Sequence, residues 1–335
     1  MYVIKARNVH QALPEACYQL QQQGVVRATR NGTVIAFPTP VTTVYARPSE
    51  RVIFWKDRDA NPFFHFFESL WMLAGRNDVA FVEVFAKNMR NYSDDGEVLH
   101  GAYGHRWRAH FGFDQLTQVA QSLKKDPTCR RQVVQMWDAR ADLSRDSKDL
   151  PCNTQIYFQI NHLHQLDMMV TNRSNDLIWG AYGANAVHFS VLQEFMASYI
   201  GVDLGTYYQT SMNTHVYWDT HGPLCDQMAL RAPMPPAEVT CPYTNQEVIS
   251  EPIMSISVNR WKRELSTFMQ WGPGSTYADP FFESVAKPML IAWTAHTKRD
   301  YPAAYAALIP CRASDWSMAC NEWLLRREVK WISKS

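Results

Sequence analysis

The sequence predicts an α+β protein, with a mixed domain over residues 1–255 and a helical C-terminal extension over residues 256–335. Two β-rich runs, 154–160 and 166–172, flank a short polar turn and are typical of a β-hairpin. Residues 184–200 form an apolar run of helical length that stops at a glycine. Beyond the mixed domain the pattern is helical, which indicates two differently built parts.

The first elements are set by start and stop signals. Residues 9–23 have a helical pattern and end at a glycine. Arg30, Asn31 and Gly32 form a turn signal, and the β-rich run 33–45 follows. Residues 61–74 are apolar on nearly every side, with a proline near the start and a glycine after the end, which predicts a buried helix.

The remaining elements follow in order. Residues 131–137 read as a strand, and so does the TYYQTSM run after Gly205. The proline-rich segment 222–256 is expected to be a connector. Helical patterns in the extension cover WKRELSTFMQW, DPFFESVAKPMLIAWTAH and DWSMACNEWLLRREVKW.

Composition narrows the class of protein. Of the 335 residues 46% are apolar and 19% charged, and the formal net charge is +1, so a protein that coats nucleic acid is not expected. Seven cysteines without a CxxC pair argue against a disulfide framework or a zinc site, and we expect no metal. No secretory signal and no membrane span of roughly 18 apolar residues is visible. We expect a cytosolic protein.

Two residues stand out chemically. Cys152 follows a proline near the start of a strand, where its thiol could face a cleft; the plain alternative is a small core residue. Glu68 lies inside the apolar helix, where a carboxylate is costly unless it is paired or functional. Its plain alternative is a side chain that reaches solvent from a helix end.

Other candidates are weak one by one. The run from Arg173 through Ser174 to Asp176 offers a cation, a hydroxyl and a carboxylate, which suits phosphate binding but also fits an ordinary polar turn. An arginine pair heads the strand at 131–137 and could be a solvated charge pair. Single histidines and tyrosines are more often structural. The weak candidates are Arg130, Arg131, Tyr103, His215 and Tyr217.

The order of these residues resembles the thymidylate synthase superfamily, which includes deoxynucleotide hydroxymethylases. The resemblance covers residues 30 to about 220. It rests on ESLWMLAG (68–75), GAYGHRW (101–107), RRQVVQMWD (130–138), PCN (151–153), NRSND (172–176) followed by Gly180, and THVY (214–217). It implies a three-layer sheet-and-helix fold, a pyrimidine deoxynucleotide monophosphate as substrate, 5,10-methylenetetrahydrofolate as cofactor and an obligate homodimer.

The resemblance also implies a role for each matching residue. Cys152 adds to C6 of the pyrimidine and makes C5 nucleophilic, and a nearby cation, Arg173, is expected to lower the thiol pKa. Glu68 relays protons and Tyr103 lines the pocket beside the thiol. The resemblance implies that the nucleotide 5′-phosphate is bound by Arg30, Arg173 and Ser174, and the phosphate in the partner subunit by Arg130 and Arg131. It implies that the sugar 3′-hydroxyl is bound by His215 and Tyr217, and that Asp176 lies near the folate ring.

Three departures from the methylating members favour water capture, hence a hydroxymethyl product, over hydride transfer. Asn153 follows the cysteine where those members have histidine, and we place Asn153 among the catalytic residues. Residues 88–96 lack the tryptophan that shields the exocyclic methylene, and the chain ends KWISKS instead of a short apolar tail. A wetter pocket favours attack by water. Such relatives are commonly viral, which would place the enzyme in a host cytoplasm.

Base choice depends on one amide. Asn185 is the candidate reader of the uracil edge, because an amide both donates and accepts, whereas a cytosine reader would be an aspartate. It lies five residues after Gly180 where the family has four. Deoxyuridylate is therefore favoured, with thymidylate synthesis and deoxycytidylate hydroxymethylation as alternatives.

Two other classes remain open. An inactive scaffold relative would not need Cys152, Glu68, Arg173 and His215 together. A cysteine hydrolase would pair Cys152 with His215, but no oxyanion signature is visible. The extension could shield the folate site, extend the dimer or bind a partner enzyme.

Overall fold

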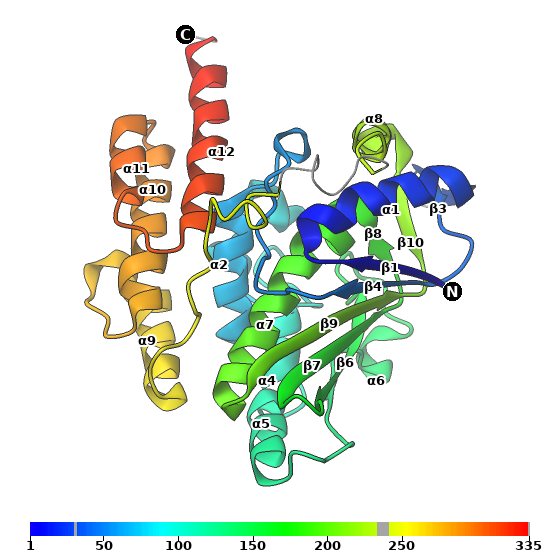
Figure 1. Ribbon diagram of the computed structural model, residues 1–335, viewed down its shortest axis with the longest axis horizontal. Helices are drawn as coiled ribbons and strands as arrows, with labels where there is room; N and C mark the ends of the chain where they lie inside the picture. Colours follow the sequence, from blue (N-terminus) through cyan, green and yellow to red (C-terminus); the bar gives the residue numbers. More distant parts are fainter. Residues whose placement is uncertain (30–31, 233–240, 334–335) are drawn as a thin grey trace.

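The computed structural model describes residues 1–29, 32–232 and 241–333 and mixes helices with two sheets, as an α+β class requires (Figure 1). Arg30 and Asn31, and with them most of the predicted turn, lie outside the described residues. No helix in the described ranges is both long enough and apolar enough to cross a membrane.

Within the described residues, the larger sheet has six strands. In spatial order they are β1 (Tyr2–Ala6), β4 (Val41–Tyr45), β9 (Asp203–Ser211), β7 (Gln165–Asn172), β6 (Asn153–Ile160) and β5 (Val133–Gln135). The predicted hairpin is β6 and β7, which pair antiparallel across the turn at 161–164. β7 pairs parallel with β9, and β9 antiparallel with β4.

A smaller sheet lies beside the large one. Its order is β2 (Val25–Thr29), β3 (Gly32–Ala36), β10 (Thr214–Tyr217) and β8 (Asn175–Asp176). β8 follows β7 almost at once, and β10 follows β9, so both sheets end in the same region. His215 is the register partner of Asp176 in the parallel β10–β8 pair.

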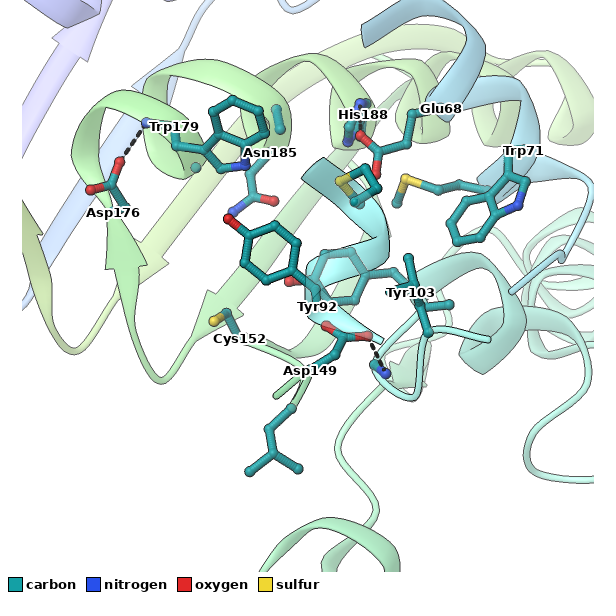
Figure 2. Close-up of a pocket in the computed structure, with 18 of the residues that line it drawn as sticks. Glu68, Trp71, Tyr92, Tyr103, Asp149, Cys152, Asp176, Trp179, Asn185 and His188 are labelled. Carbon is teal, nitrogen blue, oxygen red and sulfur yellow. Dashed lines mark hydrogen bonds and ion pairs between the residues drawn. The ribbon is translucent and has the colours of Figure 1, made fainter. Parts of the chain in front are cut away.

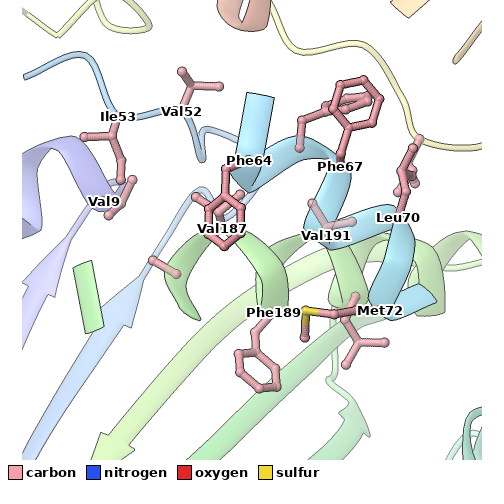
Figure 3. Close-up of a cluster of buried hydrophobic side chains, with 14 of the residues drawn as sticks. Val9, Val52, Ile53, Phe64, Phe67, Leu70, Met72, Val187, Phe189 and Val191 are labelled. Atoms are coloured by element: carbon pink, nitrogen blue, oxygen red, sulfur yellow. The ribbon is translucent and has the colours of Figure 1, made fainter. Parts of the chain in front are cut away.

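Two apolar helices form the layers behind the large sheet. α7 (Asn185–Ile200) packs on β7 and β9, and α2 (Pro62–Leu73) packs on α7. Figure 3 shows Phe64 and Phe67 of α2 against Val187 and Val191 of α7; all four are buried. Burial of such side chains is worth about 1.5–3 kcal/mol each.

The ends of these helices follow the predicted signals. Asn61 caps α2 by accepting a hydrogen bond from Phe64 N, with Pro62 in the first turn. α7 ends at Gly201, whose φ of 89° lies in the left-handed region that favours glycine. α1 (Val9–Gln23) starts at Asn8, which accepts from Gln11 N.

The opposite face of the large sheet is not covered by any helix of the described residues. Val133, Tyr157 and Met169 are register neighbours on β5, β6 and β7, and they are 41%, 39% and 36% exposed. Tyr208 continues the same row on β9. A row of apolar side chains across a sheet face is a candidate interaction surface.

The extension consists of helices stacked on the outer side of α2 (Figure 1). These are α9 (Val258–Trp271), α10 (Lys287–Thr297), α11 (Tyr301–Leu308) and α12 (Ser314–Ile332), with short helical segments η4 (Gly272–Gly274) and η5 (Phe282–Ala286) between α9 and α10. Its buried residues belong to the same hydrophobic cluster as those of α2, so the two parts share a core.

Charged contacts also fix the extension. Arg326 and Arg327 of α12 both bind Asp59, which follows the short helix η1 (Lys56–Arg58). Asp315 is buried and accepts a hydrogen bond from the Tyr243 hydroxyl at 2.8 Å. Burial raises the pKa of Asp315 to about 6.

Several elements differ from the sequence prediction. The connector expected at 222–256 begins inside a helix, α8 (Trp218–Ala229), which accommodates Pro223. A proline predicts a break, but packing of α8 against α1 keeps the helix intact. Elements that were not predicted include β1, β2, α3 (Val79–Val82), η2 (Lys87–Tyr92), α4 (Tyr103–Arg108), α5 (Gln115–Lys125), α6 (Ala139–Asp142), β8, η3 (Leu177–Ala184), β10 and α11.

Candidate active site

A cavity of about 290 Å³ lies where α2, α4 and the start of α7 meet the segment before β6 (Figure 2). Four predicted residues line it, each from a different segment: Glu68, Tyr103, Cys152 and Asn185. Asp176 lines it as well. Residues far apart in the sequence therefore converge as the predicted order of motifs implied.

Cys152 is held beside a cation. The Arg173 Nη2 atom lies 3.8 Å from the Cys152 Sγ, and the Arg173 N–H donates to the Cys152 carbonyl. Burial nevertheless raises the pKa of the thiol, Arg173 lowers it, and Asp149 raises it further. The expected lowering effect of Arg173 is therefore present, but the net thiol pKa is raised because desolvation exceeds the effect of the single nearby guanidinium.

Glu68 lies in the middle of α2 and not at a helix end, so the snorkelling alternative is wrong. Its side chain is 12% exposed, and its Oε2 lies 3.2 Å from the His188 Nε2 (Figure 2). Burial first and Asp149 second raise the pKa of Glu68 to about 8. Burial lowers the pKa of His188 to about 3. At neutral pH the facing groups are a protonated carboxyl and a neutral imidazole.

Tyr103 opens α4, which packs closely on α2. An added Cβ at the neighbouring Gly104 would come within 2.1 Å of the Met72 carbonyl oxygen, so only glycine permits this approach. Burial raises the pKa of Tyr103, whose side chain hydrogen-bonds Asn153. Asn153 is fully buried behind the pocket wall, and its Nδ2 donates to the Asn185 Oδ1 at 3.4 Å. Asn153 thus acts on the pocket through its neighbours.

A buried ion pair supports the loop that leads into α4. Arg106 and Asp142 have fully buried side chains, with two guanidinium nitrogens 2.8 and 2.9 Å from the two carboxylate oxygens. Arg106 also donates to the His100 carbonyl at 3.0 Å. Asp149, which lines the pocket, accepts from Gly101 N in the same loop. The ion pair therefore positions one wall of the cavity.

The extra residue before Asn185 has a structural cause. Residues Leu177–Ala184 form a π-helical segment, η3, with non-helical angles at Tyr182 and Gly183. A π-turn absorbs one additional residue. Asn185 then donates from Nδ2 to the Asn175 Oδ1 at 3.0 Å and lines the pocket. The unusual spacing does not displace the amide.

The phosphate and sugar candidates lie at the edge of the cavity. Asp176 accepts from Trp179 N, while its Oδ2 is buried without a hydrogen-bond partner in the described residues. His215 is its register partner, and the His215 and Tyr217 rings are 5.1 Å apart. Ser174 lies between Arg173 and β8. These residues border the cavity but, Asp176 excepted, do not line it.

Two predicted arginines are not part of this cavity. Arg130 and Arg131 are exposed just before β5, at the edge of the large sheet. Arg30 lies outside the described residues. A group of histidine, cysteine, aspartate and glutamate side chains able to hold a metal ion is not found within the described ranges.

The sequence reasoning missed several lining residues, among them Tyr92, Asp149, Trp179 and His188. His188 is one of several polar residues in the largely apolar helix α7, and its position in the sequence is that of an ordinary structural histidine. Residues 88–96 contain no tryptophan, and that absence predicted a pocket without a shielding indole. Trp179 corrects that inference, because it lines the pocket from another segment. Tyr92 adds a second ring from η2, as Figure 2 shows.

No described residue of the extension lines the cavity. The extension packs behind α2, and the lid role that the sequence left open has no support from this arrangement.

Comparisons with known proteins agree with the geometry. The family model described as thymidylate synthase matches residues 15–264. A deoxyuridylate hydroxymethyltransferase of Pseudomonas phage M6 is 53% identical over 98% of this chain and 95% of its own length. That of Bacillus phage SP01 is 38% identical over 66% of this chain and 60% of its own. A thymidylate synthase of Symbiobacterium thermophilum is 30% identical over 54% and 66%.

Proposed function

The chain belongs to the thymidylate synthase family, and from this premise we propose that it converts deoxyuridylate to 5-hydroxymethyldeoxyuridylate. Of the phage relatives that bear this activity in their names, one matches over nearly the whole chain. The observation that carries the proposal is the convergence of Cys152, Glu68 and Asn185 on one cavity. The finer architecture, a three-layer sheet-and-helix fold of this family, is part of the same proposal.

Cys152 is the nucleophile of the proposed reaction. Its thiolate adds to C6 of the pyrimidine, which makes C5 an enolate-like nucleophile. Burial favours the thiol over the thiolate, and Arg173 offsets part of that cost from 3.8 Å away. Tyr103 and Asn153 close the wall behind the thiol.

The residues fit 5,10-methylenetetrahydrofolate, which supplies the one-carbon unit when it is bound. The unpartnered Asp176 Oδ2 can accept a hydrogen bond from a ring N–H. Trp179, which is 39% exposed, and Tyr92 present aromatic faces at the same cavity. A flat heterocycle with polar edges suits this combination of rings and one carboxylate.

Substrate recognition divides among the remaining candidates. Arg173 and Ser174, together with Arg30, would hold the 5′-phosphate, while His215 and Tyr217 lie where they could bond the sugar hydroxyl. Asn185 would read the O4 and N3 edge of uracil, since its amide offers both a donor and an acceptor. Because this position is an asparagine and not an aspartate, uracil is favoured over cytosine.

A homodimer is part of the proposal. The uncovered sheet face, with the row Val133, Tyr157 and Met169, offers a self-complementary surface for a two-fold interface. Arg130 and Arg131 stand at the edge of this same face, just before Val133. If a second copy packs on this face, Arg130 and Arg131 of the first copy lie toward the phosphate site of the second copy.

A product assay tests the proposed function. The protein is incubated with methylenetetrahydrofolate and either deoxyuridylate or deoxycytidylate, and products are identified by mass spectrometry, with Cys152→Ala as the inactive control. We expect 5-hydroxymethyldeoxyuridylate. A methyl product would assign thymidylate synthesis, and a hydroxymethylated deoxycytidylate would assign the deoxycytidylate alternative. If the protein binds the nucleotide but forms no product, it is an inactive scaffold. Activity without folate would favour a hydrolase. The reaction is expected in the cytoplasm, that of the host for a phage protein.

A further inference from the structure

His188 is a buried histidine that none of the proposed roles uses. It lies one turn into α7, three residues after Asn185, and its ring lines the cavity. Its Nε2 is 3.2 Å from the Glu68 Oε2 and has no other polar partner in the described residues. Figure 2 shows the two side chains facing each other across from Cys152.

The second ring nitrogen suggests the tautomer. We assign the proton of the neutral His188 imidazole to Nδ1, because the backbone of His65 hydrogen-bonds the ring and Nε2 is the ring nitrogen without a hydrogen-bond partner in the described residues. Nε2 then presents a bare lone pair to the carboxyl. A lone pair beside a carboxylate is repelled, whereas a protonated carboxyl donates to it. The geometry therefore selects the protonated form of Glu68, with its hydrogen on Oε2.

We propose that His188 is a positioning residue that completes a proton relay with Glu68 for the capture of water, and this inference rests on the hydroxymethylating function proposed above. With Oε2 donating to His188, Oε1 is left to accept a proton from water in the cavity. Glu68 can then receive one proton while it releases another, although it is already protonated at rest.

The relay balances the water-capture step. The water oxygen bonds to the exocyclic methylene carbon, a water proton passes to Oε1, and the Oε2 proton passes to Nε2. The electron pair of the methylene double bond enters the ring as an enolate. The enolate then restores the C5–C6 double bond and expels the Cys152 sulfur as thiolate. The proton returns from His188 through Glu68 and finally neutralises the thiolate.

The surroundings keep the relay in its neutral resting form. His65 faces His188 edge-on at 6.0 Å and, itself buried, carries no charge at neutral pH. Asp149, across the cavity, disfavours a charged Glu68. Arg58 acts on His65 and disfavours a second cation nearby. An imidazolium at position 188 therefore persists only while the enolate is present to balance its charge.

The test compares His188→Gln, Glu68→Gln and the double variant with wild-type protein. Deoxyuridylate carrying tritium at C5 loses the label when the exocyclic methylene forms, before water capture. We expect His188→Gln to release about one tritium per site in a rapid phase and then to turn over about 100-fold more slowly than wild type, the scale of a lost proton-transfer group. The double variant should be no slower than Glu68→Gln, because the two residues act as a unit.

A structural role is separated by three further readouts. His296→Gln, which changes a half-buried histidine of the extension, should leave turnover unchanged. Binding of 5-fluorodeoxyuridylate reports a folded site, and His188→Met repeats the test with an apolar side chain if the glutamine variant does not bind. The pH profile of His188→Gln should lose its alkaline limb near pH 8, where Glu68 ionises.

The outcomes are distinct. A His188→Gln variant within about twofold of wild-type turnover, with an unchanged pH profile, overturns the relay alone. A slow variant that fails to release the initial tritium also overturns it, because the defect then precedes water capture. Wild-type protein that makes no hydroxymethyl product overturns the relay together with the proposed function.

Discussion

The charge balance around Cys152 gives the most direct test of the site. Burial and Asp149 raise the pKa of the thiol, and Arg173 lowers it. Arg173→Gln and Asp149→Asn should therefore change the thiolate population at a given pH in opposite directions. The first should decrease it and the second should increase it.

The distance sets the magnitude for Arg173. Two unit charges 3.8 Å apart interact with about 1 kcal/mol in water, and about 2 kcal/mol if the effective dielectric constant is roughly half that of water. The guanidinium is reached by solvent, so the lower value applies. One kcal/mol corresponds to about a fivefold change in thiolate population below the thiol pKa. Asp149→Asn should increase it by a similar or smaller factor, since no direct contact joins the two groups.

The assay is the alkylation rate of Cys152 by iodoacetamide without substrate, followed from pH 6 to 9 by peptide mass spectrometry. Only the thiolate reacts, so the rate reports its population. Cys129 is an internal reference, because the Arg131 backbone lowers the pKa of that thiol independently of the cavity. Arg260→Gln removes one positive charge from α9, where Arg260 pairs with Glu264, and controls for net charge.

Equal rates at Cys152 in wild type and Arg173→Gln would refute the electrostatic reasoning. So would a rate that falls in Asp149→Asn. Either result would mean that solvent, and not these two side chains, determines the thiol ionisation.

Three further predictions concern stability. Asp142→Asn leaves the buried Arg106 without its counter-ion and should lower the free energy of unfolding by about 3–5 kcal/mol in urea titrations. Burial makes Asp315 favour its protonated form, with a pKa of about 6 against 3.8, so its contribution to stability is present below pH 4 and lost as pH rises to 6. As pH rises from 4 to 8, the free energy of unfolding of Asp315→Asn should therefore increase relative to that of wild type by up to about 3 kcal/mol, as measured by calorimetry. Gly104→Ala should cost about 1–3 kcal/mol and reduce turnover, whereas Gly274→Ala, with open space around it, should change neither.

The parts of the fold that the sequence predicted are those whose signals are local. α2 and α7 have long apolar patterns with a proline or glycine at their ends, and the β6–β7 hairpin has two β-rich runs around a polar turn. β1 and α4 were missed because neither has a period long enough to recognise. β1 is a strand through its pairing with β4, and α4 is a helix through its packing on α2.

The site divides in the same way. Cys152 and Glu68 were found because a known order of motifs marks them, and the structure brings both to one cavity. The lowering of the thiol pKa by Arg173 was predicted, but the larger effect of desolvation was not, because desolvation depends on how completely the surrounding walls enclose a group. Trp179 and His188 come from segments whose patterns resemble ordinary core, and only packing reveals that their rings face the cavity.

These differences change the physical argument for a hydroxymethyl product. The sequence argument rested on absences: no tryptophan at 88–96 and no closing tail. Trp179 and Tyr92 line the cavity, so aromatic rings that can shield it are present. What distinguishes the cavity is its opposite wall, where Glu68 and His188 face each other at 3.2 Å. Water competes with hydride only if its proton has somewhere to go, and this pair provides an acceptor inside a largely apolar enclosure. The product is therefore decided by the presence of a proton acceptor more than by the absence of a shield.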